Sequence, residues 1–226
     1  MTGKRDIIKV QAAVYKPDII CITETKIDSN YDDNELLGDS YTVYRNDRKQ
    51  GGGGVLTAFC NASPIEVINN SVGPGESLVT TVSFFSQVTL NIVTYYRPPG
   101  ETQLDILFEI INDRDSRHPI IFTGDFNLPD ILWEKGKGYI KGSSKRQNFF
   151  LEAVNLFNGS DLVQLVQGPT HKKGNTLDLF FVEAVLFDYF EFDCSMLPGI
   201  SDHDIIFTEI VMPNYTYPKP SSKIPS

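Results

Sequence analysis

The chain has 226 residues, of which 41% are hydrophobic and 12% aromatic, enough to build the core of one α/β domain. Its formal net charge of −9 counts against a tight, passive DNA-binding module, because such modules neutralise phosphates with an excess of lysine and arginine. The charge counts less against a metal-dependent enzyme, whose acidic site is part of the negative total. We expect one domain over residues 1–212 and a Pro/Ser-rich disordered tail over residues 213–226.

Cysteine usage and hydropathy restrict the location of the protein. The three cysteines, Cys21, Cys60 and Cys194, are scattered and indicate neither a disulfide framework nor a zinc site. No apolar stretch has the length of a membrane span, and no signal peptide opens the chain. We therefore expect an intracellular, reduced monomer that makes no membrane contact.

The first half of the chain alternates one helix with several strands. Apolar periodicity predicts a helix over residues 4–15, which Pro17 ends. The apolar run at 18–23 predicts a strand buried on both faces, and the polar residues 28–40 predict a loop. Four further strands are predicted at 55–60, 64–69, 78–85 and 88–95. The short Ser86-Gln87 linker favours an antiparallel hairpin between the last two, although Ser-Gln is not a favoured turn pair.

The second half contains two helices among further strands. Helices are predicted at 102–113 and 147–157, with a buried strand at 120–123 and a Gly- and Lys-rich loop at 134–146. Four more strands are predicted at 162–166, 176–182, 185–192 and 205–212. Many strands with helices between only some of them predict a two-sheet α/β sandwich rather than a doubly wound sheet.

A run of four glycines, Gly51 to Gly54, precedes the predicted strand at 55–60. It resembles a phosphate-binding loop, but no Gly-Lys-Ser/Thr follows, so the P-loop interpretation fails. Glycine beside a strand more often marks a bulge or a close backbone approach, and we expect one of these here.

Basic residues gather in and after the predicted loop at 134–146. They are Lys135, Lys137, Lys141, Lys145 and Arg146. Two interpretations stay open: a solvated loop face, or a phosphate-contacting rim on an acidic body.

Acidic and amide side chains follow two buried strands. Glu24 ends the run 18–23, a position where α/β proteins display catalytic groups. Asp125 and Asn127 follow the strand 120–123, and on an extended backbone both would point to one face. An Asx-type turn is the alternative interpretation of this motif.

A second group of polar residues lies nearer the C-terminus. Asp178 sits in the apolar run Leu177–Phe181, where a carboxylate is costly unless paired, and His203 is the candidate partner. A nucleophilic Ser/His/Asp triad is a poor interpretation of Ser201, Asp202 and His203, because no Gly-x-Ser-x-Gly elbow is present. Carboxylates with an amide and an imidazole are what metal-assisted phosphodiester hydrolysis requires.

The motifs Glu24-Thr25, Tyr95-Tyr96-Arg97-Pro98-Pro99, Gly124-Asp125-Phe126-Asn127, Thr176-Leu177-Asp178 and Ser201-Asp202-His203 occur in one order over residues 17–207. This arrangement resembles the endonuclease/exonuclease/phosphatase superfamily, the DNase I fold. Within it, the chain is most similar to the apurinic-endonuclease-like endonuclease domain of non-LTR retrotransposons. The resemblance implies a four-layer sandwich, in which two packed, mainly antiparallel β-sheets are flanked by helices.

The sequence departs from the family at its start. The family opens with a buried strand that ends in an asparagine, whereas here Met1-Thr2-Gly3 leads directly into the predicted helix. We therefore expect the first strand to be missing and its neighbours to expose unpaired backbone groups. The asparagine would support the metal, and its loss is expected to weaken metal affinity or rate.

The resemblance also implies roles for individual residues. Glu24 binds the metal, and Asp202 is a second metal-site carboxylate or a proton relay. Asp125 is the general base or orients the water, with Asn127 as partner. Asp178 orients His203, and His203 stabilises charge on the phosphate. Tyr96 donates a hydrogen bond to the scissile phosphate, although a lone tyrosine there is more often a packed aromatic. Substrate contacts are implied for Thr170, Ser201, Arg97 and Lys172.

The function expected from this resemblance is a Mg²⁺-dependent endonuclease, with Mn²⁺ as a substitute, that nicks DNA in the nucleus. Two alternatives stay open. The first is a phosphatase or phospholipid phosphodiesterase on the same fold, since one fold serves several substrates. The second is an inactive remnant that acts as a binding module, which the negative charge and the missing asparagine favour.

Overall fold

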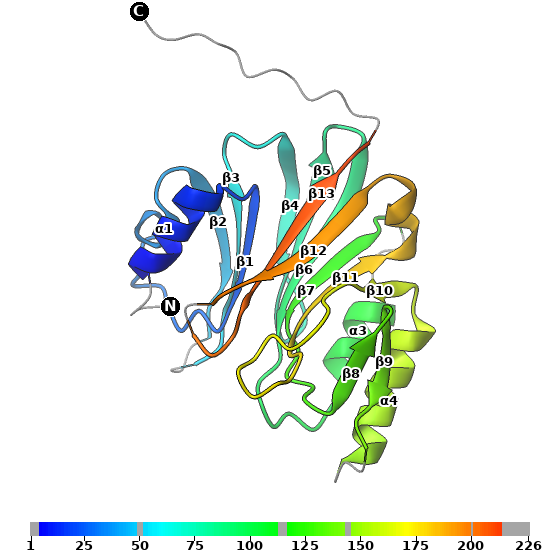
Figure 1. Cartoon of the computed structure of the whole chain (residues 1–226). Coiled ribbons are helices and arrows are strands. Elements are labelled where there is room, and N and C mark those ends of the chain that lie inside the picture. Colours follow the sequence, from blue (N-terminus) through cyan, green and yellow to red (C-terminus); the bar gives the residue numbers. More distant parts are fainter. Residues whose placement is uncertain (1–4, 49–51, 113–116, 143–145, 200, 214–226) are drawn as a thin grey trace, which may run out of the picture.

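Two β-sheets face each other at the centre of the molecule, with helices on the outside (Figure 1). This computed structural model describes residues 5–48, 52–112, 117–142, 146–199 and 201–213. The tail expected after residue 213 lies outside the described residues. None of the described helices is long and apolar enough to cross a membrane.

The smaller sheet has the antiparallel order β1-β3-β2. Its strands are β1 (Ile19–Thr23), β2 (Tyr41–Asn46) and β3 (Val55–Cys60). Helices α1 (Arg5–Tyr15) and α2 (Asp33–Leu37) pack on it through a cluster that includes Ala12, Leu36, Leu37, Leu56 and Ala58. The hairpin of β12 (Glu191–Leu197) and β13 (Ile205–Val211) crosses the inner face of the larger sheet (Figure 1).

The larger sheet has six strands in the order β10-β11-β7-β6-β5-β4. They are β4 (Ile65–Val72), β5 (Glu76–Phe84), β6 (Val88–Tyr96), β7 (Ile120–Asp125), β10 (Leu162–Gln164) and β11 (Asp178–Glu183). Only β6 and β7 are parallel. Its outer face packs on α3 (Asp105–Asn112), α4 (Gln147–Gly159) and the hairpin of β8 (Ile131–Glu134) and β9 (Lys137–Ile140).

Among the described residues, four apolar clusters fill the spaces between these layers and hold the sheets in place. One lies between α1, α2 and the smaller sheet, one on the inner face of the larger sheet, and one between the larger sheet and α3, α4. The fourth and smallest joins the two sheets through Val55, Leu78 and Tyr96. The chain therefore forms the four-layer α/β sandwich expected from its sequence, and that prediction is confirmed.

Some predicted elements are wrong in detail. Part of the expected loop 28–40 is α2, and β2 follows where no strand was predicted. The expected loop 134–146 contains the end of β8 and all of β9, as a hairpin that covers the core through Trp133 and Ile131. The expected strand 185–192 is a 3₁₀ turn, η1 (Ala184–Asp188), followed by the start of β12.

The predicted hairpin between β5 and β6 is confirmed. Gln87 N–H donates to Phe84 O at 3.0 Å, and Phe85 and Ser86 have φ angles of 52° and 57°. Two left-handed residues in a row match the twist of a tight hairpin, which explains why the turn forms without a favoured residue pair.

Two strand edges stay open on either side of a groove. Among the described strands, β1 pairs only with β3, and β13 pairs only with β12. A groove of about 710 Å³ is lined by every residue of β1 and of β13, with Ile92, Ile121 and Phe180 also in its wall. The unpaired strand edges expected from the sequence are therefore present among the described strands.

Candidate active site

Three neighbouring strands of the larger sheet place one polar residue each in a row. Tyr96 is the last residue of β6, Asp125 the last of β7, and Asp178 the first of β11. Tyr96 is opposite Asp125 across the parallel pair, and Asp125 is opposite Asp178 across the antiparallel pair. Directly opposed residues have side chains in contact range. The sheet therefore brings two carboxylates and a phenol together at one end.

Asp125 is held by the residue two positions after it. The backbone N–H of Asn127 donates to Asp125 Oδ1 at 3.0 Å, and its amide Nδ2 donates to Oδ2 at 3.0 Å. The first bond makes an Asx turn, and the φ of Asn127 is 46°. The expected extended backbone between these two residues is therefore wrong, but the turn itself brings their side chains together.

Burial and a neighbouring carboxylate change the acidity of Asp125. Its exposed fraction is 5%. Burial, followed by the charge of Asp178, raises the pKa of Asp125 to about 7, against the opposing charge of His203. Near pH 7 this carboxyl therefore exchanges its proton readily.

Asp178 and His203 form the pair that the sequence predicted. His203 Nδ1 lies 2.8 Å from Asp178 Oδ2. This hydrogen bond raises the pKa of His203 to about 9, although partial burial acts against it. His203 is therefore an imidazolium at neutral pH, with its Nδ1–H donated to Asp178.

Glu24 stands at the end of β1 and faces the row from the smaller sheet. Its carboxylate accepts a hydrogen bond from Tyr96 Oη at 2.5 Å and an ion pair from Lys26 Nζ at 2.8 Å. Burial alone would raise the pKa of Glu24, but these two partners outweigh it, and the pKa lies below its ordinary value. Burial and the same hydrogen bond raise the pKa of Tyr96, so its phenol stays protonated as a donor.

Gly53 and Gly54 accept hydrogen bonds from the two residues that follow Glu24. Thr25 N–H donates to Gly54 O and Lys26 N–H donates to Gly53 O, and both glycines have left-handed φ angles. A Cβ on Gly54 would lie 2.6 Å from Thr25 Oγ1. The expected close backbone approach is confirmed for these two glycines, and Gly51 lies outside the described residues.

The loop that contains Thr170 and Lys172 contacts the loop that contains Asp202, beside His203. Lys172 N–H donates to Asp202 O at 2.9 Å, and Asp204 N–H donates to Thr170 O at 2.7 Å. Asp202 is exposed, and His171 Nε2 lies 3.2 Å from its Oδ2. The pKa of Asp202 lies below its ordinary value, chiefly through a hydrogen bond from its own backbone N–H and then through His171.

The four residues with implied substrate contacts lie in different environments. Arg97 is 1% exposed and donates to the carbonyl oxygens of Asn127 and Glu101, and Thr170 is 0% exposed and accepts from the N–H groups of Leu177 and Asp178. A direct substrate contact does not fit these buried positions, so both residues support the site from within. Lys172 is exposed, and Ser201 Oγ accepts from His203 N–H at 3.2 Å.

The donor set fits a divalent cation. Asp125, Asp178 and His203 bring polar atoms within 4.8 Å of one another, and so do His171, Asp202 and His203. Because the histidine nitrogens that contact Asp178 and Asp202 carry protons, the carboxylate oxygens are what these groups offer to a cation. Burial and the neighbouring charge of Asp178 raise the pKa of Asp125, and a nearby cation would offset the repulsion between the two carboxylates. Carboxylate oxygens are the ligands that Mg²⁺ and Mn²⁺ prefer.

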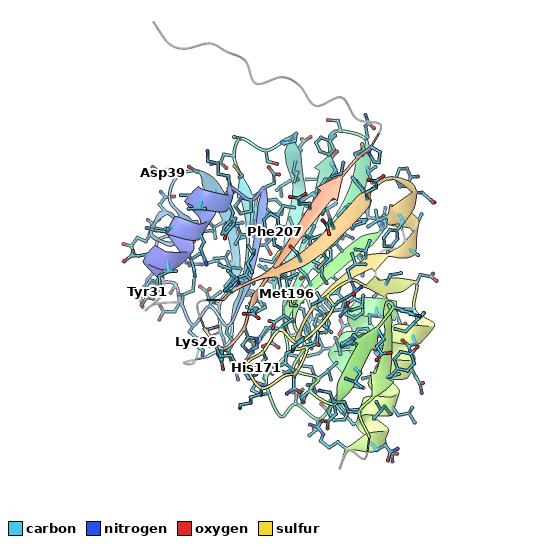
Figure 2. All side chains as sticks on the ribbon, in the orientation of Figure 1. Lys26, Tyr31, Asp39, His171, Met196 and Phe207 are labelled. Carbon is cyan, nitrogen blue, oxygen red and sulfur yellow. The ribbon has the colours of Figure 1, made fainter. Side chains whose placement is uncertain are left out.

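Two side chains in this region were missed by the sequence interpretation. Lys26 pairs with Glu24 and His171 contacts Asp202, and both lie at the same end of the two sheets (Figure 2). Each is next to or near a residue that was singled out. Only the fold shows that they point back toward the site.

The family model for the endonuclease/exonuclease/phosphatase family matches residues 3–203. No curated protein matches the chain in sequence. Among solved structures, an AP endonuclease from Archaeoglobus fulgidus has a TM-score of 0.66 at 17% identity, with 94% of this chain and 95% of that chain covered. These levels of identity show the fold alone.

Two further solved structures have the same architecture. The endonuclease domain of TRAS1, a telomere-specific non-LTR retrotransposon, has a TM-score of 0.61 at 17% identity, over 89% of each chain. The 3′ phosphatase NExo from Neisseria, bound to a product DNA hairpin, has a TM-score of 0.63 at 17% identity, over 92% of this chain and 95% of that one. With most of its length matched by the family model and its acidic residues gathered at one end of the sandwich, the chain belongs to the endonuclease/exonuclease/phosphatase family.

Proposed function

We propose that this protein is a Mg²⁺-dependent endonuclease that nicks DNA, and that it derives from a non-LTR retrotransposon. The observation that supports it most is the contact of Asp125, Asp178 and His203, since a buried carboxylate and an imidazolium meet within 4.8 Å. Hydrolysis of a phosphodiester needs both a proton acceptor and a group that stabilises negative charge.

In this proposal each residue has one task. Asp125, with its pKa of about 7, accepts the proton of the attacking water, and Asn127 fixes the direction of its lone pairs. His203, charged and held by Asp178, donates Nε2–H to a phosphate oxygen. Tyr96 orients Glu24, and Glu24 with Asp202 would hold a cation that neutralises charge on the phosphate.

DNA is the proposed substrate for two reasons. TRAS1 is described as a telomere-specific retrotransposon whose endonuclease domain shares this fold, and NExo was solved with a DNA hairpin. The exposed side chain of Lys172 lies in the loop next to Asp202, where it can contact a phosphate backbone, and Lys135 and Lys137 are exposed at the turn of the β8–β9 hairpin. A DNA target further implies work in the nucleus.

A plasmid-nicking assay tests this proposal. Supercoiled DNA is incubated with Mg²⁺, with Mn²⁺ or with EDTA, and the relaxed form is followed with time. We expect nicking only with a divalent cation, and a loss of about 100-fold or more in Asp125→Asn and in His203→Ala. Asp188→Asn, an exposed carboxylate on η1, is the matched control and should nick at the wild-type rate.

Two results would oppose the proposal. Equal residual nicking in all four proteins would indicate a contaminant and favour an inactive remnant. The second result is release of phosphate from a 3′-phosphorylated oligonucleotide while the plasmid stays intact. It would favour a phosphatase, as NExo is described, or ANGEL2, which is described as a 2′,3′-cyclic phosphatase.

A further inference from the structure

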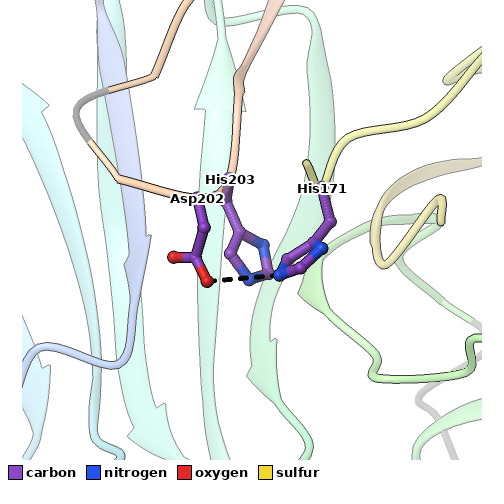
Figure 3. Close-up of side chains that lie close together, drawn as sticks. All are labelled: His171, Asp202 and His203. Atoms are coloured by element: carbon purple, nitrogen blue, oxygen red, sulfur yellow. Dashed lines mark hydrogen bonds and ion pairs between the residues drawn. The ribbon is translucent and has the colours of Figure 1, made fainter. Parts of the chain in front are cut away.

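His171 lies in the loop between β10 and β11, next to the Ser201–His203 loop. Its ring is perpendicular to that of His203, with centroids 4.7 Å apart and an interplanar angle of 84°. Its Nε2 is 3.2 Å from Asp202 Oδ2, and its Nδ1 accepts the backbone N–H of Lys173 at 3.0 Å. Figure 3 shows these three side chains together.

The two contacts of the ring determine which nitrogen carries the proton. An N–H of the main chain can only donate, so Nδ1 must present its lone pair to Lys173. In the neutral ring the proton is then on Nε2, which donates it to Asp202. His171 is thus built into the loop as a hydrogen-bond donor with a fixed direction.

Asp202 needs such a donor more than the other acids of the site. Its side chain is 65% exposed, whereas that of Asp178 is 17% exposed and bonded to His203. Among the described side chains, His171 makes the hydrogen bond and ion pair that are seen for the Asp202 carboxylate. A carboxylate with one oxygen held keeps the other in place for a ligand.

We propose that His171 is a positioning residue that orients Asp202 toward the divalent cation. This inference rests on the proposed function, in which Asp202 is a metal ligand. The side chains of His171, Asp202 and His203 could also chelate a transition metal directly. That arrangement would need the lone pair of His171 Nε2, which carries the proton as long as Lys173 N–H occupies Nδ1.

Two variants separate the two contacts of the ring. In His171→Gln the amide nitrogen takes the place of Nε2 and can still donate to Asp202. In His171→Asn the amide oxygen takes the place of Nδ1 and keeps the bond from Lys173, but the donor to Asp202 is lost. If His171 acts only by holding the turn through Lys173, His171→Asn should keep the metal affinity of the wild type. If His171 acts by orienting Asp202, His171→Gln should keep it.

Mn²⁺ affinity is measured first, without DNA, by electron paramagnetic resonance of free Mn²⁺. We expect the dissociation constant to rise about 10-fold in His171→Asn and to stay within about 3-fold of the wild type in His171→Gln. Where nicking is active, the Mg²⁺ concentration at half-maximal rate should rise in the same ratio, with the KM for DNA at saturating Mg²⁺ unchanged.

Three outcomes would overturn the inference. One is equal Mn²⁺ affinity in wild type and His171→Asn, and another is the absence of Mn²⁺ binding by the wild type. The third is tight Zn²⁺ binding that both variants lose, which would make His171 a metal ligand. Because binding is measured without turnover, a failure of nicking alone would count against the proposed function and leave this result standing.

Discussion

Gly124 determines the position of Asp125 at the end of β7. The φ of Gly124 is 142°, and a Cβ there would lie 1.8 Å from the carbonyl oxygen of Tyr95 on the parallel strand β6. The sequence predicts a strand over residues 120–123, but β7 continues through Gly124 to Asp125. The absence of a side chain lets β6 and β7 approach closely, and so aligns Tyr96 with Asp125.

Replacement of this glycine should therefore cost more than an ordinary loop substitution. We expect Gly124→Ala to lower the free energy of unfolding by about 2–4 kcal/mol, from the backbone clash and the unfavourable φ together. Urea denaturation followed by circular dichroism measures the change. Gly100→Ala is the control, because Gly100 also has a left-handed φ of 84° but nothing within 4 Å of its Cβ position. Equal losses in the two variants would contradict the close-approach argument.

Part of the strained backbone of the described residues lies at the same end of the molecule. Glu24, Lys26 and Asn127 are non-glycine residues with φ angles of 51°, 53° and 46°. Left-handed conformations of such residues are uncommon and cost free energy, so the surrounding hydrogen bonds must hold them. At Glu24 and Asn127 this conformation turns the side chain back toward its partner, Tyr96 or Asp125.

At the scale of elements, the strands with strong apolar patterns were predictable and the short polar ones were not. Runs such as 18–23 and 120–123 are continuous apolar segments, and both are strands. β2 and β9 contain tyrosine, lysine and arginine beside glycine or asparagine, and they are strands because a neighbour pairs with them. Their formation depends on tertiary context, which local periodicity does not contain.

The arrangement of site residues was predictable where the residues lie close together in the sequence or where their surroundings demand a partner. Asp125 and Asn127 are close in sequence, and a partner was expected for Asp178 because this carboxylate lies in an apolar run. Arg97 and Thr170 were taken for substrate contacts because burial cannot be read from a motif. His171 was missed because its contact to Asp202 spans 31 positions and depends on two loops meeting.

The β8–β9 hairpin bears on the two interpretations of the basic segment. Lys141 Nζ donates to Pro129 O at 3.0 Å and to Asn175 Oδ1 at 2.8 Å, so it joins the hairpin to the loop that carries His171. Lys135 and Lys137 are exposed on the same hairpin, and Lys145 lies outside the described residues. Lys141 therefore has structural contacts, and Lys137 has one as well, since its Nζ donates to Asn158 O at 3.3 Å, while Lys135 and Lys137 both stay exposed to solvent.

Substitution of the exposed pair should weaken DNA binding in a salt-dependent way. We expect Lys135→Gln/Lys137→Gln to reduce the slope of log K against log salt by about 1–2, because each phosphate contact releases roughly one counterion. Fluorescence anisotropy with a labelled duplex, in Ca²⁺ to suppress cleavage, gives the slope. Lys9→Gln on α1 is the control and should leave it unchanged. An unaltered slope in the double variant would contradict a phosphate-contacting rim and favour the interpretation as a solvated loop face.

At the scale of the whole molecule, the active site lies where the two sheets meet. Glu24 comes from the smaller sheet, Tyr96, Asp125 and Asp178 from the larger sheet, and His203 from the loop before β13. The Tyr96–Glu24 and Asp178–His203 bonds therefore join separate layers of the sandwich. Charge in the site and the stability of the fold are linked for this reason.

This linkage predicts that the metal-free protein loses stability as the pH rises. The pKa of Asp125 is raised to about 7 in the folded state, so folding favours its neutral carboxyl, and that preference is lost between about pH 4 and 7. The pKa of His203 is raised to about 9, so folding favours its charged ring, and that stabilisation is lost between about pH 6.5 and 9. Both effects have the same sign. Glu24 and Asp202, with lowered pKa values, are already ionised above pH 5.

Urea unfolding in EDTA at pH 5, 7 and 9 measures the effect. We expect the free energy of unfolding to fall by on the order of 1–3 kcal/mol across this range, with a smaller fall from pH 5 to 7 in Asp125→Asn. Mn²⁺ at pH 8 should restore stability, because a cation that binds only the folded protein adds RT ln(1 + [L]/Kd). Stability that rises with pH in EDTA, or Mn²⁺ that protects Asp125→Asn as well as the wild type, would contradict an electrostatic coupling between the cation and Asp125. A cation held by Glu24 and Asp202 beside Asp125 would favour the ionised form of this carboxyl, so part of its benefit must depend on Asp125.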